Sequence, residues 1–273
     1  SAAHAQANKM VEGWISEAKM QSWQDSVGNV WGRYASKFVD APTLILGSHL
    51  DSVVNAGKYD GVLGVLLGIE LGDFLARHKI DLPFHLDVVG FCDEEGVRFG
   101  ATLLGSQALA GKWQPDWIEL TDENGVSLAE AMTEFGLDPS KVTDAKRDPE
   151  SVRGFLEVHI EQGPLLETRG LPVGVVTDIA GARRFNLIVG GKAGHSGTVP
   201  MFMRKDALLG ASLCIQAAEE ATRRFDVLAT VGQISCDPGA VNVIPGNAQF
   251  SLDIRSAKDG VRDRALDWLL NRM

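Results

Sequence analysis

Apolar runs that end in histidine or acidic residues recur along this chain, and they constrain its fold more than any other feature. Residues 43–50 form a near-continuous apolar run, as expected of a strand buried on both faces of a sheet, and residues 84–91 are predicted as another buried strand. Helices are predicted from 62 to about 77 and from about 102 to 110, and a further strand from 155 to 160. This alternation of strands and helices favours an α/β sheet.

The pattern changes near Asp178, where we place a boundary between two domains, residues 1–177 and 178–273. The second domain is predicted as a strand, a helix, two strands and a final helix, at residues 184–189, about 205–224, 228–235, 248–254 and about 259–273. That order is typical of a small α+β sandwich, here without its last strand.

The composition favours a soluble cytoplasmic protein. The formal net charge is −10 and no run of Lys or Arg occurs, which argues against a nucleic-acid partner. Three cysteines without paired spacing indicate a reducing compartment. No segment approaches the ~18–20 uninterrupted apolar residues of a membrane span. Residues 1–20 are predicted as an amphipathic helix with Met10, Val11, Trp14 and Ile15 facing inward, rather than as a secretory signal.

Four short segments at the ends of apolar runs carry side chains of the kinds that bind metal ions. They are His49-Leu-Asp51, Asp60 before Gly61, the pair Glu94-Glu95, and His159-Ile-Glu161. Ligands of open α/β sheets gather beyond the carboxyl ends of the strands, so we expect these segments to meet at one edge of the sheet. Imidazole and carboxylate groups in this number can hold two divalent cations and leave one carboxylate as a general base.

Taken singly, each segment also has an ordinary explanation. His49 and Asp51 are two residues apart, so they point the same way on an extended backbone, and Asp51 can accept a hydrogen bond from the ring nitrogen that does not bind metal. The alternative is an unrelated pair on a surface loop. Asp60 precedes a helix and can be its N-cap. Glu94 and Glu95 point in different directions, so one can bind metal while the other takes a proton, unless both belong to a solvated acidic loop.

Five motifs resemble the M20 metallopeptidase superfamily. They are Gly47-Ser-His-Leu-Asp-Ser52, Gly57-Lys-Tyr-Asp-Gly61, Asp93-Glu-Glu-Gly-Val-Arg-Phe99, His159-Ile-Glu-Gln-Gly163 and Ala193-Gly-His-Ser-Gly-Thr-Val-Pro200. The fourth motif is the discriminating one, and with it the chain is most similar to the amidase, hydantoinase and carbamoylase branch. The resemblance implies an α/β fold with a mostly parallel-sheet catalytic domain and an inserted α+β sandwich that serves as lid and dimerisation domain.

The resemblance also implies a centre of two divalent metal ions. His49 and His159 would bind one ion, Asp60 would bridge both, and Glu95 would bind the second. Zinc fits this donor set, and manganese, cobalt or nickel would serve equally well. In the family, a late histidine completes the ligands of the second ion, and no histidine of this chain matches it. The sequence therefore looks like a fragment or a natural truncation.

Further roles follow from the same resemblance. Glu94 would be the general base that takes a proton from the attacking water and passes it to the leaving nitrogen. Asp51 would orient His49. His195, in the second domain, would stabilise the oxyanion, often at the site of a neighbouring subunit.

Three residues match positions that bind substrate, namely Gln162, Asn242 and Arg255. An arginine suits a substrate carboxylate because its planar fork can donate two parallel hydrogen bonds. From the residues alone, a surface arginine at a strand end is the simpler interpretation of Arg255. The expected partners are a small carboxylate-bearing ureido substrate and a second copy of the chain, bound through the lid domain.

The leading hypothesis is a dinuclear metal-dependent hydrolase. It would cleave the linear amide C–N bond of ureido compounds such as allantoate or N-carbamoyl-L-amino acids. An aminopeptidase or dipeptidase of the same superfamily is the first alternative. The second is a truncated remnant that binds a ligand or partner without turnover, although the intact Glu94 argues against a long-standing loss of catalysis in the parent protein.

Overall fold

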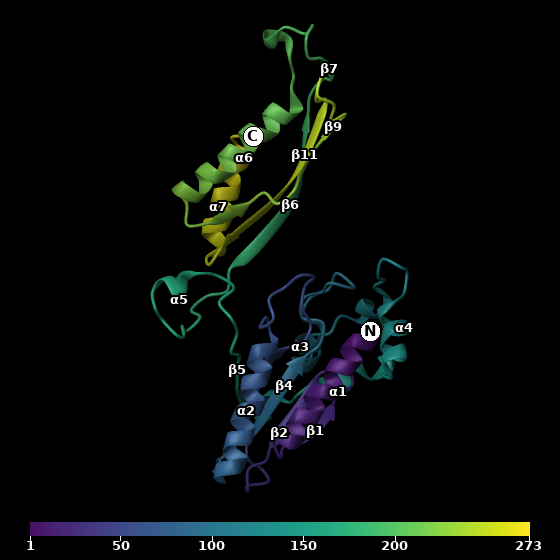
Figure 1. Cartoon of the computed structure of the whole chain (residues 1–273), viewed down its shortest axis with the longest axis vertical. Helices are drawn as coiled ribbons and strands as arrows, with labels where there is room; N and C mark the ends of the chain where they lie inside the picture. Colours follow the sequence, from purple (N-terminus) through teal and green to yellow (C-terminus); the bar gives the residue numbers. More distant parts are fainter. The chain divides into compact units, whose positions relative to one another are not determined.

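The computed structural model describes all 273 residues, which form two compact units, Ser1–Pro172 and Val173–Met273 (Figure 1). The sequence placed the boundary slightly later, between residues 177 and 178. Each unit has its own sheet and its own hydrophobic core. None of the helices is both long enough and apolar enough to cross a membrane.

The first unit alternates strands with helices. Its strands are β1 (Gln21–Gln24), β2 (Val30–Tyr34), β3 (Thr43–His49), β4 (His85–Phe91) and β5 (Val152–Leu156). Its α-helices are α1 (Ala2–Glu17), α2 (Val62–His78), α3 (Leu104–Leu109), α4 (Leu128–Phe135) and α5 (Leu165–Thr168). Three short 3-10 helices, η1 (Pro115–Glu119), η2 (Pro139–Ala145) and η3 (Pro149–Ser151), lie between α3 and β5.

The sheet of the first unit is mixed, with the strand order β1-β2-β4-β3-β5. β3 runs parallel to β4 and β5, whereas β1 and β2 pair antiparallel with each other and β2 pairs antiparallel with β4. The expectation of a mostly parallel sheet is thus met only in the β4-β3-β5 half. β1 and β2 form a hairpin because the Asp25 carboxylate accepts the backbone N–H groups of Val27 at 3.1 Å and Asn29 at 3.0 Å. Such a short turn can only join antiparallel strands.

β5 lies earlier in the chain than the strand predicted at 155–160. Its pairing with β3 stops at Leu46, which lies opposite Leu156. His159 therefore lies beyond the strand rather than at its end, on a segment that no ladder of backbone hydrogen bonds joins to the sheet.

Helices cover both faces of this sheet (Figure 1). On one face, Val11 of α1 and Val65 and Ile69 of α2 pack against Val30 and Val88 of the sheet. On the other face, Leu109 of α3 packs against a cluster of Trp31, Ile45, Val89 and Phe91. The central strands β3 and β4 are buried on both sides, as their apolar sequence predicts.

The buried stripe of α1 is narrower than predicted. Val11 and Ile15 are buried, as expected, but Met10 is 50% exposed and Trp14 is 39% exposed. Asn8 is buried in their place, one turn before Val11, because its side-chain amide donates to the backbone of the turn after β1 at 3.1 Å. Spacings of three and four residues put these three side chains on one helix face.

Asp87 of β4 is fully buried and holds two arginines. Arg33 donates to its carboxylate at 2.6 and 2.8 Å, and Arg147 donates at 2.8 Å. Asp87→Asn leaves both guanidiniums without a counter-charge, and we expect it to lower the free energy of unfolding by about 3 kcal/mol. Urea denaturation of the metal-free protein measures this.

The control for this prediction is an exposed ion pair in the same unit. Nζ of Lys37 lies 3.0 Å from Oδ2 of Asp81, and both side chains are well exposed. Asp81→Asn should change the free energy of unfolding by less than about 1 kcal/mol. Equal losses in the two variants would show that the ion pairs of Asp87 with Arg33 and Arg147 stabilise the fold no more than an exposed ion pair does.

The second unit is built around the long central strand β11. Its strands are β6 (Gly181–Gly190), β7 (Gly194–His195), β8 (Leu228–Thr230), β9 (Ile234–Asp237), β10 (Val243–Ile244) and β11 (Asn247–Ser256). Its helices are η4 (Met201–Met203), α6 (Ala207–Arg224) and α7 (Asp259–Leu270). β11 pairs antiparallel with β6, β8 and β9, and β7 pairs with β10.

One face of this second sheet is covered and the other is open. Alternate residues of β11, from Ala248 to Ile254, are buried against α6 and α7 (Figure 1). The residues between them, which include Asp253 and Arg255, lie on the open face because successive side chains of a strand alternate.

Candidate metal centre

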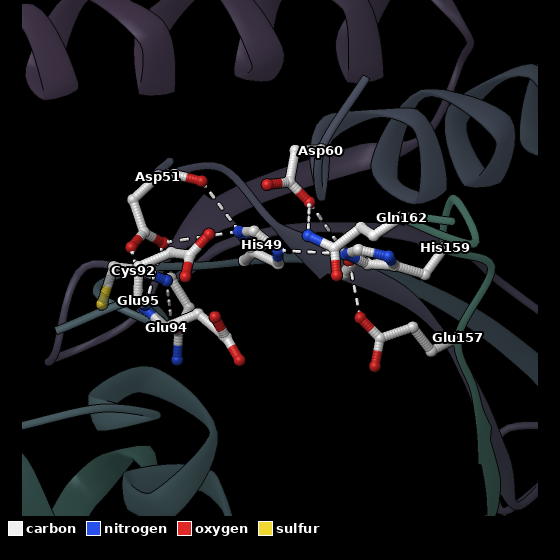
Figure 2. Close-up of polar contacts among 11 residues, drawn as sticks. His49, Asp51, Asp60, Cys92, Glu94, Glu95, Glu157, His159 and Gln162 are labelled. Atoms are coloured by element: carbon white, nitrogen blue, oxygen red, sulfur yellow. Dashed lines mark hydrogen bonds and ion pairs between the residues drawn. The ribbon is translucent and has the colours of Figure 1, made fainter. Parts of the chain in front are cut away.

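Histidine and carboxylate side chains meet at the carboxyl edge of the parallel strands β4, β3 and β5 (Figure 2). His49 is the last residue of β3, and Glu94 and Glu95 follow β4. Asp60 lies just before α2, and His159 lies just after β5. This is the sheet edge at which the sequence placed them.

His49, Asp60 and His159 form a first group of ligands. One ligand atom from each lies within 4.8 Å of the others. The Nε2 atoms of the two histidines are 3.3 Å apart, and Nε2 of His159 is 3.4 Å from Oδ1 of Asp60. His49 and Asp60 are buried. In Figure 2 the three side chains point toward one another.

The backbone selects the tautomer of both neutral imidazoles. Nδ1 of His49 contacts the carbonyl oxygen of Asp51 at 2.8 Å, and Nδ1 of His159 contacts the carbonyl oxygen of Ile160 at 2.8 Å. A carbonyl can only accept, so each Nδ1 carries the proton and each neutral Nε2 presents a lone pair. Two such lone pairs 3.3 Å apart repel unless a cation lies near both. The donor set therefore fits a divalent metal ion.

Asp60 is not the N-cap of α2, so the ordinary explanation of this residue is wrong. The cap position is Gly61, and no side chain caps the helix. The Asp60 carboxylate instead accepts a hydrogen bond from Nε2 of Gln162 at 2.9 Å. Gly61 has a φ of +70°, and a Cβ there would lie 2.5 Å from the His49 ring. A glycine after Asp60 thus lets the helix begin against the imidazole.

His49, Glu94 and Glu95 form a second group, again with ligand atoms within 4.8 Å of one another. No such group joins Asp60 with Glu95. Both glutamates are half-buried. Burial raises the pKa of Glu94, the carboxylates of Glu95 and Asp51 act in the same direction, and His49 opposes them. A carboxylate whose pKa is raised binds a proton more readily, which suits a base that must later act as an acid.

The Asp51 side chain holds the loop of the two glutamates. Its Oδ1 accepts the backbone N–H of Glu94 at 3.0 Å, and its Oδ2 accepts that of Glu95 at 3.0 Å. The nearest carboxylate oxygen is 3.9 Å from Nδ1 of His49, which donates to the Asp51 backbone instead. Asp51 therefore contacts His49 through its main chain and the glutamates through its side chain.

Two residues that the sequence analysis did not single out join the segment after β5 to β3. The hydroxyl of Ser48 donates to Oε1 of Glu157 at 2.6 Å, one residue before His49 and two before His159. Ser48 belongs to the Gly47–Ser52 motif and Glu157 lies two residues before the His159 motif, but nothing in the motifs predicts this contact.

His195 and Asn242 lie together in the second unit. His195 of β7 pairs with Val243, and the carbonyl of Asn242 accepts the N–H of Ser196 at 3.0 Å. Nδ1 of His195 accepts the N–H of Gly197 at 3.0 Å, so the neutral ring carries its proton on Nε2. The ring is exposed and offers that N–H as a donor.

Arg255 lies apart from His195 and Asn242 within the same unit. It is near the end of β11, whereas Asn242 precedes the start of that strand. The nine residues from Asn247 to Arg255 span roughly 26 Å in an extended strand. Arg255 is an exposed arginine near the end of a strand, as the simpler interpretation has it, and it donates to the Asp253 carboxylate at 2.8 and 2.9 Å.

Known proteins match this chain over nearly its whole length. The model of peptidase family M20/M25/M40 matches residues 45–257. The N-carbamoyl-L-amino acid amidohydrolase of Geobacillus stearothermophilus is 42% identical over 265 residues, which cover 97% of this chain and 65% of that protein. The allantoate deiminase of Arabidopsis thaliana is 41% identical over 300 residues, which cover 100% of this chain and 57% of that protein.

A solved structure shows the same fold. The crystal structure of an amidase of the hydantoinase/carbamoylase family from Burkholderia multivorans superposes with a TM-score of 0.89 at 32% identity, covering 99% of this chain and 66% of that one. The chain spans 57–66% of the length of these three proteins. By the family model and by these relatives, the chain belongs to peptidase family M20/M25/M40, in its hydantoinase/carbamoylase branch.

Proposed function

We propose that the chain carries the catalytic machinery of a metal-dependent hydrolase of ureido compounds. The substrate would be allantoate or an N-carbamoyl-L-amino acid, and the bond cleaved would be a linear amide C–N bond. The observation that carries this proposal is the convergence of two imidazole Nε2 lone pairs and a buried carboxylate beside a half-buried glutamate. The names of the two relatives that are more than 40% identical support the substrate class.

His49, Asp60 and His159 would hold one divalent ion, and Glu95 would help to hold a second, which Asp60 would bridge to the first. Zinc, manganese, cobalt and nickel all suit imidazole and carboxylate ligands. When bound, such ions acidify water and polarise a carbonyl. Gln162 donates to Asp60, so Gln162 would be free to contact substrate once Asp60 turns to a metal.

Glu94 would act as the general base and then as the general acid. Its carboxylate would accept a proton from the attacking water and deliver it to the leaving nitrogen as the C–N bond breaks. Asp51 would support this role by fixing the backbone of Glu94 and Glu95. His195 would donate a hydrogen bond from its Nε2–H group to the developing oxyanion.

We propose residues 1–177 as the catalytic domain and residues 178–273 as the lid and dimerisation domain. Asn242 and Arg255 would bind the substrate. Arg255 lies near the end of β11 and Asn242 lies before its start, which supports a dimer, since one copy of the second unit would not present His195, Asn242 and Arg255 to the same small substrate. In a dimer, the second units of two copies could together supply these three residues to one substrate.

The test is ammonia release from allantoate and from a series of N-carbamoyl-L-amino acids, with zinc, manganese or cobalt supplied. We expect release from at least one of these ureido compounds, and none after chelation of the metal. Cleavage of dipeptides without any ammonia release would favour an aminopeptidase or dipeptidase instead. Metal binding without turnover of either class would favour a non-catalytic binding protein.

A further inference from the structure

Three charged side chains share the open face of the second sheet. Asp253 and Arg255 are two residues apart on β11, and Arg184 of β6 lies directly opposite Asp253. Arg255 donates from Nε to Oδ1 of Asp253 at 2.8 Å and from Nη2 to Oδ2 at 2.9 Å. Arg184 donates from Nε to Oδ2 at 3.0 Å. One carboxylate is thus held by two guanidiniums.

The bond to Asp253 uses one edge of the Arg255 guanidinium and leaves another edge free. A guanidinium presents five N–H groups in a planar fork and can meet a carboxylate at its Nε/Nη2 edge or at its Nη1/Nη2 edge. Nη1 of Arg255 has no hydrogen-bond partner in the protein, and the side chain is 45% exposed. The free edge can bind a second carboxylate, in a direction that Asp253 fixes.

The charges at this place also favour an anion. Asp253 stays ionised, because the hydrogen bonds from Arg255 and, to a smaller extent, Arg184 lower its pKa to about 2. Two guanidiniums share this one negative charge, so one positive charge remains, on a chain whose formal net charge is −10. Without Arg184, the Asp253–Arg255 pair would be neutral and would attract a carboxylate less strongly.

We propose that Asp253 and Arg184 are positioning residues for the carboxylate of the substrate. Asp253 holds the Arg255 guanidinium so that its free edge faces the incoming carboxylate, and Arg184 keeps the site positively charged. The inference rests on the proposed function, in which Arg255 binds the carboxylate of a ureido substrate.

Asp253→Asn separates positioning from simple charge. The variant keeps the size of the side chain and removes a negative charge, so charge alone would tighten the binding of a carboxylate. Positioning gives the opposite result. We expect KM for an N-carbamoyl-L-amino acid to rise about tenfold, as for a lost charge-assisted bidentate contact, while kcat changes little. KM for the matching carboxamide, which lacks the charge, should stay the same. A KM for the acid that falls or stays unchanged would overturn the role of Asp253.

Arg184 gives a second test that leaves the Asp253–Arg255 pair in place. Arg184→Gln should raise KM for the acid severalfold, and Arg184→Lys, which keeps the charge, should restore most of it. Arg183→Gln is the matched control, because Arg183 is the next residue of β6 but faces α7, where it lies 3.6 Å from Asp263. Equal increases of KM in the two glutamine variants would show a long-range charge effect and would refute the role of Arg184.

The wild-type protein, loaded with metal, separates this inference from the proposed function. If it releases ammonia from no ureido compound, the proposed function fails and the inference fails with it. If it hydrolyses the acid and the carboxamide with the same KM, the function stands but the carboxylate site is refuted. A lower KM for the acid, raised by Asp253→Asn and by Arg184→Gln, supports both.

Discussion

Replacing Glu94 with glutamine should lower kcat for ammonia release by about 10²–10⁴-fold, the range expected for loss of a general base. Glu94 lies beside His49 and Glu95, and an amide in its place cannot take a proton from water at neutral pH. The fold of the loop should not change, because Asp51 binds the backbone N–H of residue 94 rather than its side chain. Steady-state kinetics at saturating metal measures the effect.

Metal content distinguishes a lost base from a lost ligand. Elemental analysis of Glu94→Gln should give the same amount of bound metal as the wild-type protein. Glu70→Gln is the control for removal of one negative charge, since Glu70 is exposed on α2 and contacts only Arg77, at 3.3 Å. Wild-type turnover in Glu94→Gln would refute Glu94 as the base, and a parallel loss of metal would make it a ligand instead.

His49→Ala is expected to have the largest effect on metal binding, because His49 belongs to both groups of ligands. Loss of a contact that only orients a ligand lowers metal affinity about 10–100-fold, and loss of the ligand itself should exceed that. Calorimetric titration with zinc and with manganese measures the affinity, and it needs no substrate. The result is therefore independent of the reaction that the protein catalyses.

Two further histidine variants show where the metal binds. His159 belongs to the first group only, so His159→Ala should match His49→Ala if that group holds the tighter ion. His78→Ala is the control, since His78 is exposed at the end of α2 and bonds to the carbonyl of Phe74 at 2.8 Å. Unchanged affinity in His49→Ala would place the metal elsewhere in the protein.

The meeting of the metal-binding side chains could be predicted from sequence, because apolar strands that run parallel bring their ends to one sheet edge. The contacts that orient them could not. His49 and His159 both donate to backbone carbonyls, which have no signature in the sequence. The Asp51 carboxylate binds two backbone N–H groups for the same reason: the path of the loop after β4 decides its partners.

In the second unit, too, some contacts could be predicted from the sequence and others could not. Asp253 and Arg255 share a face because they are two residues apart on a strand, and that relation is visible in the sequence. The place of Arg184 depends on the register of β6 against β11, which local sequence does not determine. Strand β1 was not predicted, because its hairpin with β2 depends on the side chain of Asp25 in the turn.

The early end of β5 has a consequence for how the protein responds to its metal. From Glu157 to Gln162 the contacts of polar atoms with the preceding structure all involve side chains: Ser48 donates to Glu157 at 2.6 Å, Gln162 donates to Asp60 at 2.9 Å, and the Nε2 atoms of His49 and His159 face each other at 3.3 Å. Two of these three contacts involve the residues of the first metal group. A bound ion would therefore hold this segment against the sheet, and part of its binding free energy would be used to order the segment. Metal affinity and the stability of this loop are in this way thermodynamically linked.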